Sequence, residues 1–116
     1  MSEIYRLLAR LGIGSKYRGY QLTALAVHLS INNADGVPPL KNLYTDISKM
    51  CKCSFSSIER NIRTVIKVAW DCNRDLLAKI ATYPLTRPPT VTQFIDILSI
   101  YFIRQRIEKE QSSVHR

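Results

Sequence analysis

The stretch that decides the fold is CSFSSIERNIRTVIKVAW, residues 53–70. Its apolar residues recur with the 3.6-residue period of an α-helix, which predicts one amphipathic helix with a buried stripe. Either Ser54 or Ser56 can cap its start, and Ser56 with Glu59 fits the capping-box pattern. The expected core-facing residues are Ile58, Ile62, Val65, Ile66, Ala69 and Trp70.

Apolar residues recur at helical spacing in five other segments, and glycine- or proline-containing stretches separate these segments. Few segments alternate as strands do, so we expect an all-α fold, a six-helix domain that forms a single unit over residues 1–116. Hydrophobic residues make up 46% of the chain, which suffices for a core, and no apolar run approaches the roughly 18 residues of a membrane span. The expected helices cover residues 2–11, 17–33, 43–51, 54–70, 73–83 and 91–109, with a frayed end at 111–116.

The helix at 43–51, the tight connection CKCS and the helix at 54–70 have the spacing of a helix-turn-helix. In that motif the second helix lies in the major groove of DNA, and its N-terminal residues meet the base edges. We therefore expect residues 54–70 to be a recognition helix. The alternative is an ordinary solvated helix face, on which charges serve solubility.

The charge balance favours the first interpretation, because 17 Lys and Arg oppose 9 Asp and Glu, a net charge of +8. An arginine fork can bond guanine O6 and N7 together, and a glutamate can accept from cytosine N4. The residues expected to read bases are Ser57, Glu59, Arg60 and Arg63, with Arg60 as the main one. The residues expected to contact phosphates are Lys16, Arg18, Lys52, Ser54, Ser56 and Lys67.

Catalytic and metal chemistry find little support in the sequence. No nucleophile–base pair, phosphate-binding loop or metal cluster stands out, so we expect neither an enzyme nor a cofactor. The three cysteines, Cys51, Cys53 and Cys72, form no C-x-x-C pair, and their odd number argues against a closed disulfide framework. Reduced thiols in a cytoplasmic protein are the simplest interpretation.

Four stretches in order carry a resemblance to a known family: LGIGSKYRGYQL (11–22), NLYTDISKM (42–50), SSIERNIRTVIKVAW (56–70) and PPTVTQFI (88–95). The chain resembles the C-terminal DNA-binding domain of the stage-zero sporulation protein A family of response regulators. The likeness covers residues 3 to about 108. It implies a six-helix domain with a helix-turn-helix that binds short DNA boxes and regulates transcription.

The resemblance also implies roles for particular residues. Glu59 and Arg60 match the family's base-reading pair, and Arg63 matches a further basic position. The family usually has an arginine where this chain has Ser57, so the box preference or the affinity differs. This departure keeps a second hypothesis open, that of a protein-interaction module that has lost specific DNA recognition.

The partners that the resemblance implies are double-stranded DNA, a second copy in tandem on repeated boxes, and the RNA polymerase sigma subunit. Full-length family members also carry an N-terminal receiver domain, which these residues do not contain. The chain is therefore either an excised effector domain or a short relative, and Met1 does not decide which.

The last helix carries more apolar residues than one buried stripe requires. Two explanations are open at this point, namely deep burial within the domain and contact with a second subunit. The stripe contains Phe94, Ile95, Leu98, Tyr101 and Phe102, and the residues that widen it are Ile97, Ile100, Ile103 and Ile107.

Overall fold

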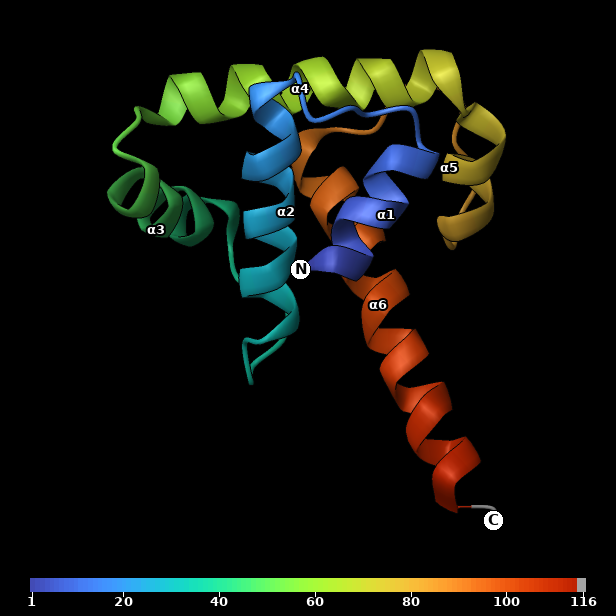
Figure 1. Ribbon diagram of the computed structural model, residues 1–116. Coiled ribbons are helices and arrows are strands. Elements are labelled where there is room, and N and C mark those ends of the chain that lie inside the picture. Colours follow the sequence, from blue (N-terminus) through green and yellow to red (C-terminus); the bar gives the residue numbers. More distant parts are fainter. Residues whose placement is uncertain (115–116) are drawn as a thin grey trace.

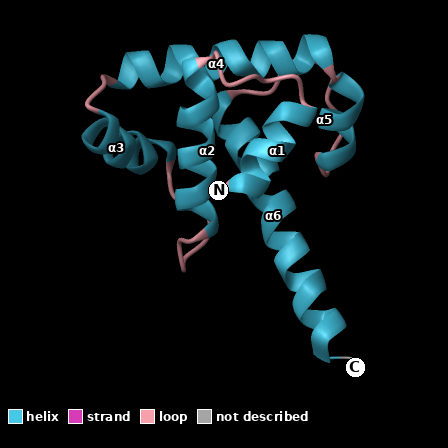
Figure 2. Cartoon of the chain, viewed as in Figure 1, coloured by secondary structure: helices cyan, strands magenta, loops and turns pink. Residues whose placement is uncertain are grey.

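The computed structural model describes residues 1–114, which form six helices and no strand (Figures 1 and 2). This confirms the all-α class and the number of helices. None of the helices within residues 1–114 is long and apolar enough to cross a membrane. In chain order the helices are α1 (Ser2–Arg10), α2 (Arg18–Ile31), α3 (Leu40–Cys51), α4 (Phe55–Cys72), α5 (Arg74–Ile80) and α6 (Val91–Val114).

Helix α2 is the centre of the domain. It contacts α1, α3, α4 and α6, and its contacts with α4 and α6 are the most extensive. Small side chains on α2, among them the fully buried Ala24 and Ala26, allow these neighbours to approach closely. Figure 1 shows α4 lying across one end of the molecule, with α6 beginning close to α4 and running away from it.

The start of α2 meets the middle of α4 at Gly19. A Cβ atom added at Gly19 would collide with the backbone oxygen of Asn61 and would lie 2.8 Å from Cγ1 of Val65. Only a residue without a side chain permits this approach. The contact therefore fixes the distance between α2 and α4, and with it the side of α4 that remains exposed.

Helix α4 is held at both ends. Helix α3 lies beside its start and α5 beside its end (Figure 1). At the α5 end Trp70 is only 8% exposed, and the guanidinium carbon of Arg74 lies 4.1 Å from the centre of its ring. All six residues of the stripe expected on α4, of which Ile58 is the first and Trp70 the last, are buried.

Three helix boundaries differ from the sequence prediction by three residues or more. Helix α3 begins at Leu40, directly after Pro39, whose carbonyl accepts a hydrogen bond from the backbone N–H of Leu43 at 3.2 Å. Helix α5 ends at Ile80. Helix α6 continues to Val114 instead of ending near Lys109. The frayed end predicted for residues 111–116 is therefore wrong for residues 111–114. Residues 115–116 lie outside the described part of the chain.

The two halves of the apolar α6 differ in burial, and only the explanation by deep burial is confirmed, for the first half. In the proximal half, Phe94, Ile95 and Leu98 are buried in the common core. Further along, Ile100 is 39% exposed and Ile107 is 48% exposed. Deep burial thus explains the first half of the helix and leaves the second half unexplained.

Substitution of Gly19 by alanine tests the close contact between α2 and α4. We expect Gly19→Ala to lower the free energy of unfolding by about 1–3 kcal/mol, because the added methyl group has no space between the two backbones. Chemical denaturation followed by circular dichroism measures this change.

Gly14 provides the matched control, since a Cβ atom added there has no neighbour within 4 Å. Gly14→Ala should leave the stability unchanged or raise it slightly, through a less flexible unfolded chain. Equal stabilities of the two variants would contradict the close packing at Gly19.

Candidate nucleic-acid interface

The turn between α3 and α4 sets the start of the second helix. Lys52 follows α3 in the left-handed conformation, with φ 52° and ψ 49°. The backbone N–H of Cys53 then donates to the Ser48 carbonyl at 3.3 Å, and the Oγ of Ser54 accepts a hydrogen bond from the backbone N–H of Ser57 at 3.1 Å. The connection is thus completed in three residues, 52–54, and α4 begins directly after it.

Ser54 is therefore the N-cap of α4. The capping box predicted from Ser56 and Glu59 is wrong, because Ser56 is already the second residue of the helix. Ser57 occupies the place three residues after the cap where a glutamate would complete a box. As a consequence Glu59 has no capping role, and its carboxylate is available on the outer side of the helix.

The outward side of α4 forms the floor of a groove with a volume of about 590 Å³, here called the α4 groove. It brings together most of the charged residues that the sequence singled out on this helix. The residues that line the groove are Tyr17, Ser56, Glu59, Arg60, Arg63, Thr64, Lys67 and Val68.

One side of the α4 groove is bordered by the segment that leads into α2. Tyr17 lines the groove, while Lys16 and Arg18 on either side of it are exposed. The Nζ of Lys16 lies 5.2 Å from the centre of the Tyr17 ring, which places its positive charge close to the aromatic face. Two of the predicted phosphate contacts thus lie beside the predicted base-reading residues.

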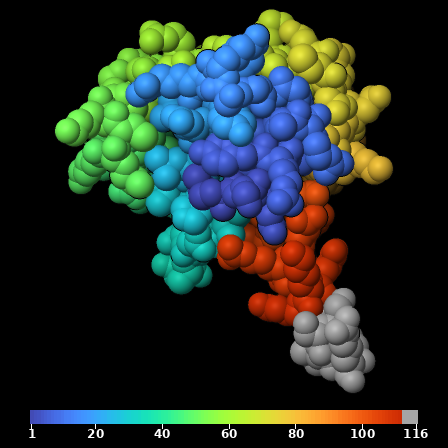
Figure 3. All heavy atoms as spheres, viewed as in Figure 1, coloured from blue at the N-terminus to red at the C-terminus, as the bar shows by residue number. Residues whose placement is uncertain are grey.

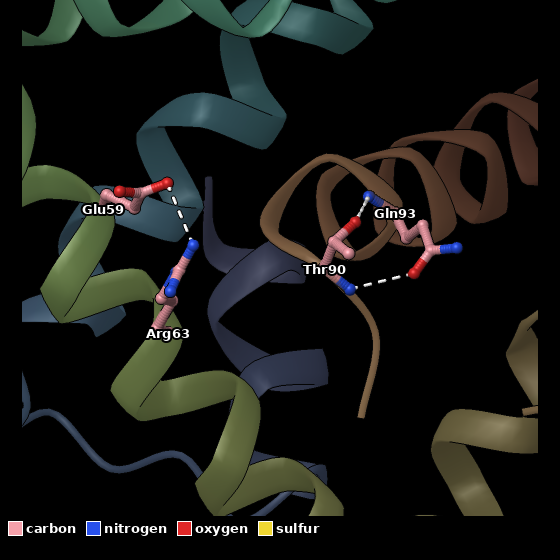
Figure 4. A network of polar contacts seen from close by, with 4 residues as sticks. All are labelled: Glu59, Arg63, Thr90 and Gln93. Atoms are coloured by element: carbon pink, nitrogen blue, oxygen red, sulfur yellow. Dashed lines mark hydrogen bonds and ion pairs between the residues drawn. The ribbon is translucent and has the colours of Figure 1, made fainter. Parts of the chain in front are cut away.

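The other side is bordered by the segment before α6. Pro88, Pro89 and Thr90 share a second hollow of about 460 Å³ with Arg63 and Lys67. Thr90 and Gln93 cap α6 reciprocally. The Thr90 N–H donates to Gln93 Oε1 at 2.9 Å, and the Gln93 N–H donates to Thr90 Oγ1 at 3.2 Å (Figure 4). This capping box holds the border segment in place beside α4.

The cations of the groove differ in their pairing. Arg63 donates to the Glu59 carboxylate at 3.4 Å (Figure 4), and Lys67 donates to Asp71 at 3.1 Å. Both pairs are well exposed, so each contributes little to stability and can exchange for another anion. The guanidinium of Arg60 makes no ion pair within the described residues, and its charge is available to a ligand.

Ser57 lies apart from the groove. It is half-buried, and the Nδ2 of Asn61 donates to its carbonyl at 2.7 Å and approaches its Oγ at 3.4 Å. It is not among the lining residues. The base-reading role of Ser57 stays a prediction, as do the phosphate contacts of Lys52 and Ser54 at the exposed start of the helix.

Tyr44 on α3 lies behind this surface and contributes no charge to it. Its ring packs edge-on against Phe55 at 5.8 Å, and its hydroxyl is buried without a hydrogen-bond partner. Burial raises the pKa of Tyr44 to about 12; nearby Glu59 also raises it, while Arg63 opposes the change. Tyr44 is therefore uncharged near neutral pH.

The sequence analysis missed the borders of the groove. Tyr17 and the segment Pro88–Thr90 lie far from α4 in the chain, and only the folded arrangement brings them beside it. Both belong to stretches that carry the family resemblance, which was the one signal available for them. Within the described residues no three His, Cys, Asp or Glu side chains are grouped to hold a metal ion.

The fold and the groove define a helix-turn-helix domain with a basic, outward-facing second helix. The chain belongs to the family described as sporulation initiation factor Spo0A C terminal, whose model matches residues 4–102. It is therefore a DNA-binding effector domain of the Spo0A type, from a family of sporulation transcription regulators that bind double-stranded DNA. No solved structure matches the chain.

Removal of the N-cap should weaken the start of α4. We expect Ser54→Ala to lower the free energy of unfolding by about 1 kcal/mol, because the N–H of Ser57 loses its acceptor. Ser56→Ala is the matched control, since it removes the same hydroxyl two residues later at an exposed helical position. Thermal or chemical denaturation measures the stability of both variants. A larger loss of stability for Ser56→Ala than for Ser54→Ala would contradict the assignment of Ser54 as the N-cap.

Proposed function

We propose that the chain is a sequence-specific transcription factor domain that inserts the N-terminal half of α4 into the major groove of DNA. The observation that carries this proposal is the unpaired guanidinium of Arg60 in the α4 groove, between two borders formed by other parts of the chain. Helix-turn-helix domains read bases from this part of the second helix, and arginine recognises guanine with two parallel hydrogen bonds.

In this proposal Arg60 is the main base-reading residue, and Glu59 and Arg63 complete the reading set. The Glu59–Arg63 ion pair keeps both side chains extended along the exposed side of α4 before DNA binds. Arg63 can then exchange the carboxylate for a base or phosphate, while Glu59 becomes free to accept from a cytosine amino group. Discrimination thus comes from three side chains within two turns of one helix.

Phosphate contacts are proposed for Lys16, Arg18, Lys52 and Lys67. They surround the start and the sides of α4, where the two DNA strands would pass. We further propose that the domain acts in the cytoplasm as a regulator without enzymatic activity, and that the RNA polymerase sigma subunit is its partner in transcription.

The second candidate function is a protein-interaction module that has lost specific DNA recognition. The observation that favours it is Ser57, which replaces the usual family arginine and is turned toward Asn61. The two candidates differ in what they predict for duplexes that differ by single base pairs. At a fixed salt concentration, only a domain that reads DNA sequence binds such duplexes with different affinities.

Arg60→Ala tests the proposed base contact. We expect it to cost about 1–3 kcal/mol on the specific box and to relax discrimination at one base pair, because the fork to guanine is lost. Competition binding with a series of singly substituted duplexes measures both effects. Arg6→Ala is the control, since it removes the same charge from an exposed position on α1. Unchanged base preference in Arg60→Ala would reassign this residue to the phosphates.

Lys16→Ala and Arg18→Ala test the phosphate contacts. Each should weaken binding to all duplexes alike, because phosphates carry no sequence information. The plot of log K against log salt should become shallower by about one unit for each lost contact. A loss confined to the specific box would show that these residues contribute to specificity.

We also propose that two copies bind tandem boxes, because one recognition helix covers too few base pairs for selectivity in a genome. Binding to two boxes spaced by whole helical turns should be cooperative. A shift of one box by about five base pairs places the second copy on the opposite face of the duplex and should abolish the cooperativity. Gel-shift titration of both duplexes measures this, and cooperativity that survives the shift would rule out a rigid tandem contact.

A further inference from the structure

The distal half of α6, here residues 103–111, points away from the body of the domain (Figures 1 and 3), and Gln105, Arg106 and Lys109 on its inner side still border a hollow shared with α1 and α2. The match to the family model ends at residue 102, just before this segment. Its exposed side nevertheless keeps an apolar stripe that begins at Ile100. Ile100, Ile103 and Ile107 are spaced by three and four residues, the pattern with which one helix packs along another.

The charges beside this stripe have a definite arrangement. With 3.6 residues per turn, Arg104 and Glu108 lie on one flank of the stripe and Arg106 and Glu110 on the other. On each flank the arginine precedes the glutamate by four residues. All four side chains are exposed, and within the described residues none of them makes an ion pair.

This arrangement selects one orientation for a partner helix of the same sequence. In a parallel pair opposite flanks meet in register, so Arg104 would approach Arg106 of the second copy, and Glu108 would approach Glu110. In an antiparallel pair each flank meets the same flank of the partner. Arg104 then faces Glu108 of the second copy and Arg106 faces Glu110, which gives four favourable contacts around a two-fold axis beside Ile107.

We propose that the distal half of α6 pairs antiparallel with the same segment of a second copy of this chain. The contact covers the exposed Ile107, which the domain itself leaves in water, at the two-fold axis. The interface is short, so the dimer is weak and reversible, as is usual for contacts below about 1,200 Å².

The pairing has a consequence for DNA that rests on the proposed function. Helix α4 lies at one end of the molecule, and the distal half of α6 points away from it (Figure 1). An antiparallel pair therefore places its two α4 grooves at opposite ends. Such a dimer holds two separate duplex segments, which distinguishes it from two copies in tandem on adjacent boxes.

Charge exchange tests the pairing directly. Sedimentation velocity of the full chain, over a series of micromolar concentrations, should show a monomer–dimer equilibrium. R104E/R106E and E108R/E110R should each weaken the dimer by about tenfold or more, because every flank contact becomes repulsive. An equimolar mixture of the two double variants should restore it, since opposite charges then face one another on both flanks.

Ile107 provides an independent pair of variants. Ile107→Glu should abolish the dimer and Ile107→Leu should keep it, with helix content checked by circular dichroism. A wild-type chain that remains monomeric at the highest concentration would overturn the proposal. So would a dimer that is indifferent to the double charge changes, or double variants whose mixture is not restored.

DNA binding is measured separately, by gel shift on a duplex with one box, so that the two proposals can fail independently. Loss of the dimer with intact binding would refute the pairing alone, and absent binding with an intact dimer would refute the proposed function alone. If both hold, an immobilised duplex should retain a second, labelled duplex in the presence of the wild-type chain and not of R104E/R106E. Failure of the wild-type dimer to retain it would refute the opposed arrangement of the grooves.

Discussion

The close approach of α2 to α4 at Gly19 is the constraint on which the rest of the structure depends. It places the backbone of α2 against Asn61 and the side chain of Val65, on the inner side of α4. Because α2 also contacts α1, α3 and α6, this one contact relates α4 to the whole core. The outward side of α4 is what remains, and the segment before α2 is carried to its edge with Lys16, Tyr17 and Arg18.

The same constraint explains how a weakly stabilised surface can be well positioned. The ion pairs Glu59–Arg63 and Lys67–Asp71 are exposed and contribute little to stability. The position of the surface comes instead from the buried stripe beneath it, from the Ser54 cap and from the Thr90–Gln93 capping box at its border. Charged side chains are therefore free to exchange partners without cost to the fold, as a binding surface requires.

Much of this could be predicted from the sequence, because the periodicity of apolar residues is a local signal. The six helices, the buried stripe of α4 and the Glu59–Arg63 pair all follow from spacing within one helix. The choice between Ser54 and Ser56 as the cap could not be made, since both stand near the expected start of the helix, and only the folded turn shows that the N–H of Ser57 donates to Ser54. The borders of the groove depend on contacts between distant segments, and no local pattern reports these.

The end of α6 shows a different limit. The polar residues from Gln111 onward resemble a fraying end, yet the helix continues to Val114. Exposure separates the two halves of this helix, and exposure is a property of the folded chain. The proximal half serves the core, whereas the distal half presents the exposed apolar and charged residues on which the proposed pairing depends.

The most direct test of the central claim, that the outward side of α4 reads DNA sequence, is a selection of bound duplexes from a random pool by the wild-type chain. The claim predicts enrichment of one short box that contains an invariant G·C pair, the base pair that an arginine fork recognises. Recovery of a pool with no enriched box, under salt conditions in which the chain still binds bulk DNA, would contradict it. The basic surface would then serve only the phosphates.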